Sequence, residues 1–597
     1  MSSYEDRLNA LREQLRADRL DGFVVPLTDE HMSEYVGSYA QRLAWLTGFQ
    51  GSAGSAVVLP EEAAIFVDGR YTLQVRDQVD GRHWSYQSVP ETSIADWLKG
   101  HAADGARIGY DPWLHTSDWV KRAGEALAGK GAELVPVGRN PIDLVWGDRP
   151  EPSKARLEVH SDRYAGRSSA AKRQEMADWL KAEKADAAVL SALDSIAWTF
   201  NVRGRDVEHT PVGLSFAIVH DDGTADFFAE SEKIGDDVRQ HLGNGVRLHE
   251  RSGFAGHLAS LAGKTVVADP ERAVAAVFEA LEGAGAKVLR KRDPSVLPKA
   301  IKNEVEIAGH RAAQARDGAA LTRFLHWLSV EGPKGGVDEL SAAAKLHQFR
   351  QAGGDLRDTS FDTISGAGPN GAIVHYRVSE ETNRRLEMNS LYLVDSGGQY
   401  PDGTTDVTRT VAIGQPTEEM RDRFTRVLKG HIAIARALFP DGTRGSQLDT
   451  LARQFLWQAG LDYAHGTGHG VGSYLSVHEG PQRISPAGSS QSGGDEPLKA
   501  GMFLSNEPGY YKAGEYGIRV ENLVLVEPRE VEGAEKKMLG FETLTFAPID
   551  RALVEVAMLS PEERRWLNDY HARVLEVVGR QIDAEVSDWL REQCAPL

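Results

Sequence analysis

The first 300 residues alternate two patterns of apolar and polar positions. At 1–20, leucines recur every three or four residues among charged side chains, which predicts an amphipathic helix. Short apolar runs follow at 22–26, 56–60 and 63–67, with turn residues around them, and such runs are typical of buried strands. Helices that alternate with buried strands predict an α/β domain in this part of the chain.

The same order of patterns returns further along the chain. A helical pattern at 168–185 leads into the apolar run 186–193, and 213–229 predicts a hairpin with Asp-Asp-Gly at 221–223 as its turn. Between the two segments, 147–160 is rich in proline and charge, which indicates a linker. The repeated order of helix, buried strand, Ala-Trp motif and glycine-containing loop predicts two copies of one domain type.

The third part of the chain opens with a long amphipathic helix at 301–328. We expect two further helical stretches, then a glycine-rich core of strands from Thr359 to about Val526, and a final helix at 562–593. The Ser- and Gly-rich segment 485–497 is predicted to be a mobile surface loop. These patterns predict domains at 1–160, 161–298, 299–540 and 541–597.

Composition narrows the class of protein. A length of 597 residues predicts roughly three to five domains. The formal charge of −19 disfavours nucleic acid as a partner, because binding to phosphates relies on clustered Lys and Arg. The sequence has no run of about 18 apolar residues, so no membrane span is expected. The first residues also lack the pattern of a secretory signal. Cys594 is the single cysteine, so an intrachain disulfide is excluded and a cytoplasmic location is expected.

Five side chains of metal-ligating type lie in four short segments of the predicted core. Four are carboxylates and one is an imidazole: Asp395, Asp406, His469, Glu507 and Glu521. An oxygen-rich shell of this kind suits two divalent cations, and manganese, cobalt and zinc all remain open on the residues alone. Two cations that share a water lower its pKa to near neutrality, which equips a site for hydrolysis.

Local sequence indicates how these side chains come together. The strands that carry Asp395 and Asp406 flank Pro-Asp-Gly at 401–403, so a hairpin brings the two carboxylates close to each other. Two buried aspartates at such a distance repel, and cations remove that repulsion. Arg519 and Glu521 stand two positions apart on a strand predicted at 517–526, so both side chains are expected on one face.

Longer motifs around these residues resemble a known family. GAGPNGAIVHY, DSGGQYPDGTTDVTRT, HGTGHGVGSYLSVHEGPQRIS, LSNEPGYY and GIRVENL are similar to the pita-bread metallopeptidases, the group that holds methionine aminopeptidase, prolidase and aminopeptidase P. LTGFQGSAGSAVV, VDGRYTLQ and ALDSIAWTFNVRGRDVEHTPV look like the long, three-domain X-prolyl aminopeptidase branch of that family. The resemblance therefore covers nearly the whole chain.

The resemblance implies a fold and a set of roles. The fold is two creatinase-like α/β domains followed by an α+β pita-bread catalytic domain. The five side chains above are implied as ligands of two metal ions, with manganese as the implied metal and Asp406 and Glu521 bridging both. The implied substrate contacts are Arg70, His375, His465, His478 and Arg519. The family also implies a homodimer.

The expected reaction is hydrolysis of the bond between an N-terminal residue and a following proline, through a hydroxide that bridges the metals. Glu507 is the expected proton shuttle, and His375 and His478 are expected to stabilise the oxyanion. A prolidase with the same ligands is the nearest alternative, and its X-Pro dipeptide substrate would separate the two. Methionine aminopeptidase needs only about the last third of the chain. A creatinase-like amidinohydrolase or a peptide-binding module without enzymatic activity would lack this ligand set.

Overall fold

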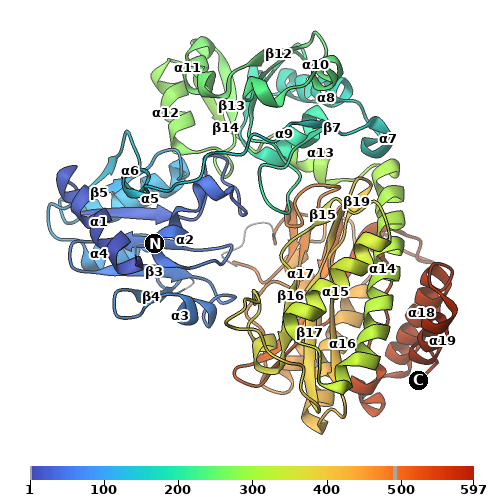
Figure 1. The fold of residues 1–597 in the computed structure, drawn as a ribbon. Helices are drawn as coiled ribbons and strands as arrows, with labels where there is room; N and C mark the ends of the chain where they lie inside the picture. The colour runs from blue at the N-terminus through green and yellow to red at the C-terminus, as the bar shows by residue number, and fades with distance from the viewer. Residues whose placement is uncertain (1–2, 90, 489–493) are drawn as a thin grey trace. The chain divides into compact units, whose positions relative to one another are not determined.

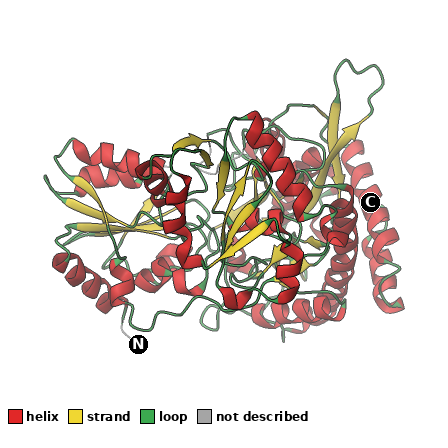
Figure 2. Ribbon diagram, turned by 90° about the horizontal axis from the view of Figure 1, so that it is seen from above, coloured by secondary structure: helices red, strands yellow, loops and turns green. Residues whose placement is uncertain are grey.

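The computed structural model describes residues 3–89, 91–488 and 494–597. The chain folds as two compact units, Met1–Val296 and Leu297–Leu597. Helices and strands are mixed in both units (Figure 1, Figure 2). Within the predicted loop at 485–497, residues 489–493 lie outside the described residues.

The first unit begins with a six-stranded sheet in the order β4-β3-β2-β1-β5-β6. Helix α1 (Tyr4–Ala17) has a capping box at Ser3 and buries Leu8, Leu11 and Leu15, as the leucine spacing predicts. The strands are β1 (Gly22–Pro26), β2 (Ser55–Val58), β3 (Ala63–Val67), β4 (Ser85–Ser88), β5 (Arg107–Tyr110) and β6 (Glu133–Pro136). The helices that follow α1 are α2 (Arg42–Thr47), α3 (Gln74–Gln78), α4 (Ile94–His101), α5 (Ser117–Ala128) and α6 (Pro141–Val145).

A second six-stranded sheet repeats this topology in the order β12-β11-β10-β8-β13-β14. The central strand pairs antiparallel with one neighbour and parallel with the other in both sheets. The predicted repeat is therefore confirmed, and so is the hairpin β10–β11 around 221–223. The strands are β8 (Ala187–Leu190), β10 (Phe216–His220), β11 (Ala225–Phe228), β12 (Val246–His249), β13 (Thr265–Ala268) and β14 (Lys287–Arg290), and the helices include α8 (Ser169–Ala182), α9 (Leu193–Phe200), α10 (Asp236–Leu242), α11 (Phe254–His257) and α12 (Ala275–Gly283).

Helix α14 (Glu304–Glu331) lies near the start of the second unit and confirms the predicted long helix. Asn303 and Glu306 form a capping box at its N-terminus. One α-helix, α15 (Glu339–Ala352), follows before strand β15 (Asp358–Thr359), and all residues between α14 and β15 are described. The two further helical stretches expected in this part of the chain are the short 3-10 helix Gly332–Lys334 and α15.

The strand-rich core consists of several small sheets. Strands β16-β17-β20 form one sheet, β21-β28-β27-β24-β22-β23 a larger one, and β15-β18-β19 and β25-β26 two short ones. Two helices that the pattern analysis did not predict, α16 (Glu418–Ala435) and α17 (Gly445–Trp457), interrupt this core in sequence. The strands are β16 (Ile364–Ala367), β17 (Ser390–Ser396), β18 (Gly398–Tyr400), β19 (Gly403–Thr404), β20 (Val407–Ile413), β21 (Phe439–Pro440), β22 (Gly468–Gly470), β23 (Glu479–Ile484), β24 (Phe503–Asn506), β25 (Gly509–Lys512), β26 (Tyr516–Arg519), β27 (Asn522–Arg529) and β28 (Met538–Thr543).

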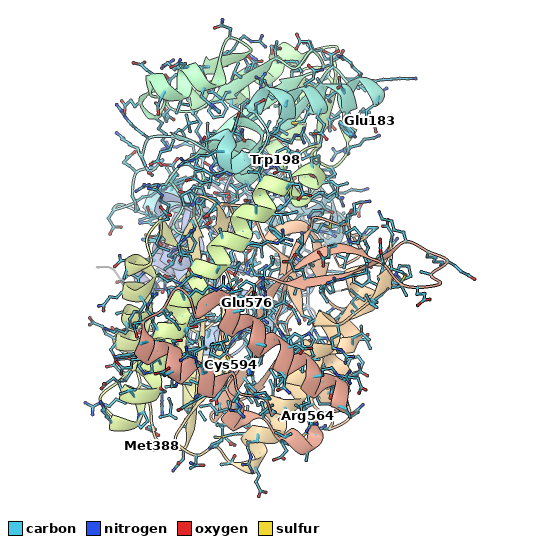
Figure 3. The ribbon with its side chains drawn as sticks, turned by 90° about the vertical axis from the view of Figure 1, so that its right-hand side faces the viewer. Glu183, Trp198, Met388, Arg564, Glu576 and Cys594 are labelled. Atoms are coloured by element: carbon cyan, nitrogen blue, oxygen red, sulfur yellow. The ribbon has the colours of Figure 1, made fainter. Side chains whose placement is uncertain are left out.

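The C-terminal helix predicted at 562–593 is divided into two. Helix α18 (Pro561–Val578) ends before Gly579, and Asp583 caps a new helix, α19 (Ala584–Gln593). Figure 3 shows Arg564 and Glu576 on α18 and Cys594 at the end of α19. The break allows both helices to pack on one apolar cluster, because Val574 of α18 and Leu590 of α19 are both buried in it.

No helix in the described part of the chain is long and apolar enough to cross a membrane.

Candidate metal centre

Antiparallel pairing of β17 and β20 places the first two predicted ligands. Asp395 is opposite Thr408 in this ladder, and Asp406 directly precedes β20. The chain between them continues into β18 and β19, which pair from Tyr400 to Gly403 and form the predicted tight turn. The hairpin predicted from Pro-Asp-Gly is thus confirmed, with its tip in a separate small sheet.

His469 lies in β22, and backbone contacts fix its orientation. Its Nδ1 lies 2.9 Å from the Gly470 carbonyl oxygen, so Nδ1–H donates to that oxygen. The lone pair of Nε2 then faces the carboxylates, where a cation can be bound between them. Nε2 lies 3.4 Å from Asp406 Oδ2 and 3.4 Å from Glu507 Oε1.

The two glutamates come from separate segments that meet beside His469. Glu507 follows β24, and Ser505 Oγ donates to its Oε1 at 3.1 Å. Glu521 lies between β26 and β27, so the predicted continuous strand at 517–526 is wrong. The break does not remove Glu521 from the site, because Thr408 Oγ1 donates to its Oε2 at 2.8 Å.

The donor set fits divalent cations. Ligand atoms of Asp406, His469 and Glu521 all lie within 4.8 Å of one another, and the three side chains are buried. Oδ1 of Asp395 and Oδ1 of Asp406 are buried without a hydrogen-bond partner. Carboxylate oxygens of this kind are costly to bury, and coordination of a cation satisfies them. Four of the five predicted ligands are buried, and Glu507, which lies 3.4 Å from His469, is half-buried.

Electrostatics agree with this fit. Burial raises the pKa of Asp406 well above its usual value, and the neighbouring Asp395 raises it further. The pKa of Glu521 is raised well above its usual value by burial and then by Asp406 and Asp395. Burial also raises the pKa of Glu507, although His469 partly offsets the effect. A site that disfavours its own negative charges in this way favours positive ions.

Arg519 lies beneath the carboxylates and is almost fully buried. One terminal nitrogen donates to Asp395 Oδ2 at 2.7 Å, and the other donates to the Tyr511 hydroxyl at 2.6 Å. Its Nε donates to Thr408 Oγ1 at 3.1 Å, and Thr408 in turn contacts Glu521. These contacts link Arg519 to two predicted ligands, directly to Asp395 and through Thr408 to Glu521. The substrate contact implied for Arg519 by the resemblance stays a prediction.

Replacing Arg519 by lysine is expected to lower metal affinity by about 10–100-fold, because groups that orient ligands contribute on this scale. A lysine cannot reach Asp395, Thr408 and Tyr511 together. Arg311→Lys is the matched control, since Arg311 pairs with Glu542 at the surface. Metal titration of both variants by calorimetry measures the effect, and equal affinities in the two variants would refute the role of Arg519.

The other predicted site residues lie in different surroundings. The ring of His478 packs edge-on against His469, with centroids 4.3 Å apart. His465 Nε2 lies 2.8 Å from the Tyr511 hydroxyl, which links it to Arg519. His375 is half-buried in the loop that follows the turn Gly368–Ala372. Arg70 belongs to the first unit, where its guanidinium pairs with Asp68 at 2.7 Å.

Three residues of the site were not singled out by pattern. Thr408 stands two positions after Asp406, and Ser505 two positions before Glu507. Residues two apart along extended backbone point to the same side, so this spacing was a usable signal, although Asp406 directly precedes β20 and Glu507 follows β24. Tyr511 had no such signal, because its contact with Arg519 depends on the pairing of β25 with β26.

Comparison with known proteins decides the family. The model of metallopeptidase family M24 matches residues 308–528, and models described as Creatinase/Prolidase N-terminal domain match 7–144 and 148–306. The C-terminal region of peptidase M24 matches 537–597. A probable Xaa-Pro aminopeptidase P of Aspergillus flavus is 40% identical over 612 residues, which cover 99% of this chain and 92% of the relative. The chain belongs to metallopeptidase family M24.

Further proteins similar to this M24 chain extend the comparison. A probable Xaa-Pro aminopeptidase P of Laccaria bicolor is 41% identical over 614 residues, covering 99% of this chain and 93% of the relative. The crystal structure of X-prolyl aminopeptidase from Caenorhabditis elegans, described as a cytosolic enzyme with a di-nuclear active site, matches with a TM-score of 0.95. It is 35% identical, and all of both chains is covered. The resemblance and the predicted fold class are therefore confirmed.

Proposed function

We propose that this M24 chain is an Xaa-Pro aminopeptidase, which hydrolyses the peptide bond between an N-terminal residue and a following proline. The observation that carries the proposal is the buried cluster of carboxylates around one imidazole, in a chain similar from end to end to proteins of that name. The substrates are peptides of the form Xaa-Pro-Yaa. The acidic charge of −19 argues against nucleic acid as a partner.

We infer that two divalent cations bind in the cluster, in line with the di-nuclear site named for the C. elegans protein. The residues that would hold them are Asp395, Asp406, His469, Glu507 and Glu521. Manganese is the cation we propose, because oxygen ligands with one imidazole suit it. When bound, the cations activate water as a nucleophile and polarise the carbonyl of the scissile bond.

Glu507 is the proposed proton shuttle. Its carboxylate accepts a proton from the attacking water and donates it to the proline nitrogen, which must be protonated before it leaves. In the site without cations, burial raises the pKa of Glu507. Ser505 Oγ, at 3.1 Å, holds one carboxylate oxygen in place.

The histidines and Arg70 are proposed to bind the substrate. His478 and His375 donate hydrogen bonds to the oxyanion that develops at the carbonyl. His465 and Arg70 contact the peptide. The short chain of contacts from His465 through Tyr511 to Arg519 supports a common placement of His465 with the carboxylates.

Replacing His478 by alanine is expected to lower kcat by about 10²–10³-fold, the usual effect of removing one donor to an oxyanion. His478 is not among the proposed ligands, so metal content is expected to stay unchanged. Steady-state kinetics and metal analysis of the same sample measure both effects. Full turnover in His478→Ala, or loss of the metal, would show that its assigned role is wrong.

The proposed activity predicts a clear choice between substrates. The purified chain with Mn²⁺ is expected to release the first residue from an Arg-Pro-Pro peptide, and a chelator is expected to abolish the release. An Xaa-Pro dipeptide should be a much poorer substrate than the tripeptide. Preference for the dipeptide would favour a prolidase, and no release with any of Mn²⁺, Co²⁺ and Zn²⁺ would exclude the enzyme.

The proposal also includes the domain organisation, the location and the oligomeric state. We retain domains at 1–160, 161–298, 299–540 and 541–597, and the positions of the matched family regions support this division. A cytosolic location is supported by the description of the C. elegans protein. A homodimer is proposed from the family resemblance, and the exposed Trp457 is one apolar residue available for an interface.

A further inference from the structure

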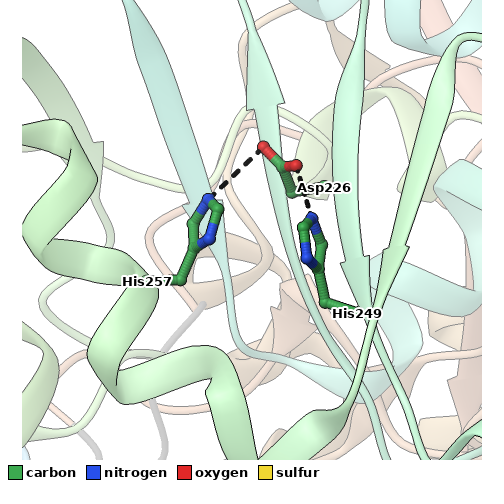
Figure 4. Close-up of side chains that lie close together, drawn as sticks. All are labelled: Asp226, His249 and His257. Carbon is green, nitrogen blue, oxygen red and sulfur yellow. Dashed lines mark hydrogen bonds and ion pairs between the residues drawn. The ribbon is translucent and has the colours of Figure 1, made fainter.

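A second cluster of metal-ligating side chains lies in the first unit. Asp226 stands on β11, and three histidines direct their Nε2 atoms toward its carboxylate. The nitrogen-to-oxygen distances are 2.7 Å for His220, 2.8 Å for His249 and 3.7 Å for His257. Figure 4 shows Asp226 between His249 and His257, with a dashed line to each.

Sheet register explains why these side chains share one face. Ile218 of β10 is opposite Asp226, and Arg247 of β12 is opposite it on the other side. His220 and His249 each lie two positions further along their strands, so alternation places them on the same face as Asp226. His257 reaches this face from the last residue of α11.

Phe228 orients two of the rings. It is fully buried, two positions after Asp226, and stacks on His249 with centroids 4.8 Å apart and planes 20° apart. His257 meets the same ring edge-on at 5.1 Å. Both imidazoles are thus held in position by packing, which reduces the rearrangement required for a shared ligand.

We propose that Asp226, His220, His249 and His257 form a structural site for one Zn²⁺-like divalent cation. Ligand atoms of Asp226, His249 and His257 already lie within 4.8 Å of one another. Tetrahedral zinc with bonds of about 2.0–2.1 Å places neighbouring ligand atoms about 3.3 Å apart. His220, whose Nε2 lies 2.7 Å from Asp226 Oδ2, is the imidazole we assign as the fourth ligand. Imidazole-rich donors favour Zn²⁺ over Mn²⁺, unlike the carboxylate-rich cluster of the second unit.

Arg247 is the group that competes with the cation. Its guanidinium forms two hydrogen bonds with Asp226, at 2.7 and 2.9 Å, while the Asp226 side chain is only 2% exposed. The Arg247 side chain is 54% exposed, so it can move into solvent when a cation binds. A bound ion would connect β10, β11, the edge strand β12 and α11 through a single atom.

Zinc uptake by the full chain tests this site independently of the aminopeptidase activity. We compare wild type with His220→Ala/His249→Ala/His257→Ala by equilibrium dialysis against Zn²⁺. Because the second unit is unchanged, the proposal predicts one fewer zinc ion per chain in the variant. Equal zinc content in the two proteins would overturn it, whether or not the chain cleaves Xaa-Pro peptides.

Single variants test the site separately, so the result does not depend on whether the triple variant folds. His257→Ala is expected to lower zinc affinity at this site at least tenfold. The control His101→Ala, at the end of helix α4, is expected to leave the affinity unchanged. Arg247→Gln removes the competing cation and is expected to tighten zinc binding. Weaker or unchanged zinc binding in Arg247→Gln would show that the cluster is only a set of ion pairs and would overturn the proposal.

Discussion

Replacing Asp406 by asparagine is expected to lower kcat/KM for an Xaa-Pro-Yaa peptide by at least about 10³-fold, because a cation site that loses a shared carboxylate loses several kcal/mol of transition-state stabilisation. Asp406 lies at the centre of the cluster. Its carboxylate is 3.4 Å from His469 and contributes to the raised pKa of both glutamates. An amide keeps the shape of the side chain but removes the negative charge.

Asp402→Asn is the matched control for this experiment. Asp402 lies in the turn of the same hairpin but pairs with Arg316 at 2.6 Å, outside the cluster. Its replacement is expected to leave kcat/KM within about twofold of wild type, because its side chain lies outside the cluster. The measurement is steady-state kinetics with saturating Mn²⁺. Comparable activity in Asp406→Asn and wild type would contradict the assignment of Asp406 as a ligand.

Removal of the cations is expected to make the stability of the second unit fall as pH rises above about 4, the ordinary pKa of an unfolded carboxyl. The folded-state pKa values of Asp406, Glu507 and Glu521 are all raised, chiefly by burial. A carboxyl with a raised pKa contributes its full stability below the unfolded pKa of about 4, where both states are protonated. That contribution is lost as pH rises toward the folded pKa, because the unfolded chain releases the proton first.

Thermal unfolding of the chain in a chelator, followed from pH 5 to pH 8, measures this effect as a change in unfolding temperature. Added Mn²⁺ is expected to remove most of the loss, since it binds the folded state. Asp406→Asn in the same chelator is expected to unfold at a higher temperature than wild type at pH about 8, because one repelling charge is gone. A chelated wild type whose unfolding temperature is constant or rises with pH would contradict the charge balance described here.

Local sequence predicted the parts of the fold that depend on local signals. The leucine spacing of α1, the amphipathic pattern of α14 and the Pro-Asp-Gly turn all specify structure from local signals, and the structure has each of them. The five proposed ligands were identified in the same way, because they stand in short, recognisable motifs.

Features that depend on tertiary packing were not predictable from pattern. The division of the C-terminal helix lets Val574 and Leu590 bury in one cluster, and the local helical pattern continues across the break. The strand that carries Arg519 and Glu521 is interrupted so that Arg519 contacts Asp395 and Glu521 contacts Thr408. The Asp226 cluster was missed because its four side chains come from three strands and a helix.

Anomalous diffraction from a crystal of the full chain grown with Mn²⁺ tests the central claim most directly. We predict two anomalous peaks about 3.5–4 Å apart, the separation usual in two-metal sites. Both should lie within bonding distance of oxygens or nitrogens from Asp395, Asp406, His469, Glu507 and Glu521. A single peak, or none among these five side chains, would contradict the account.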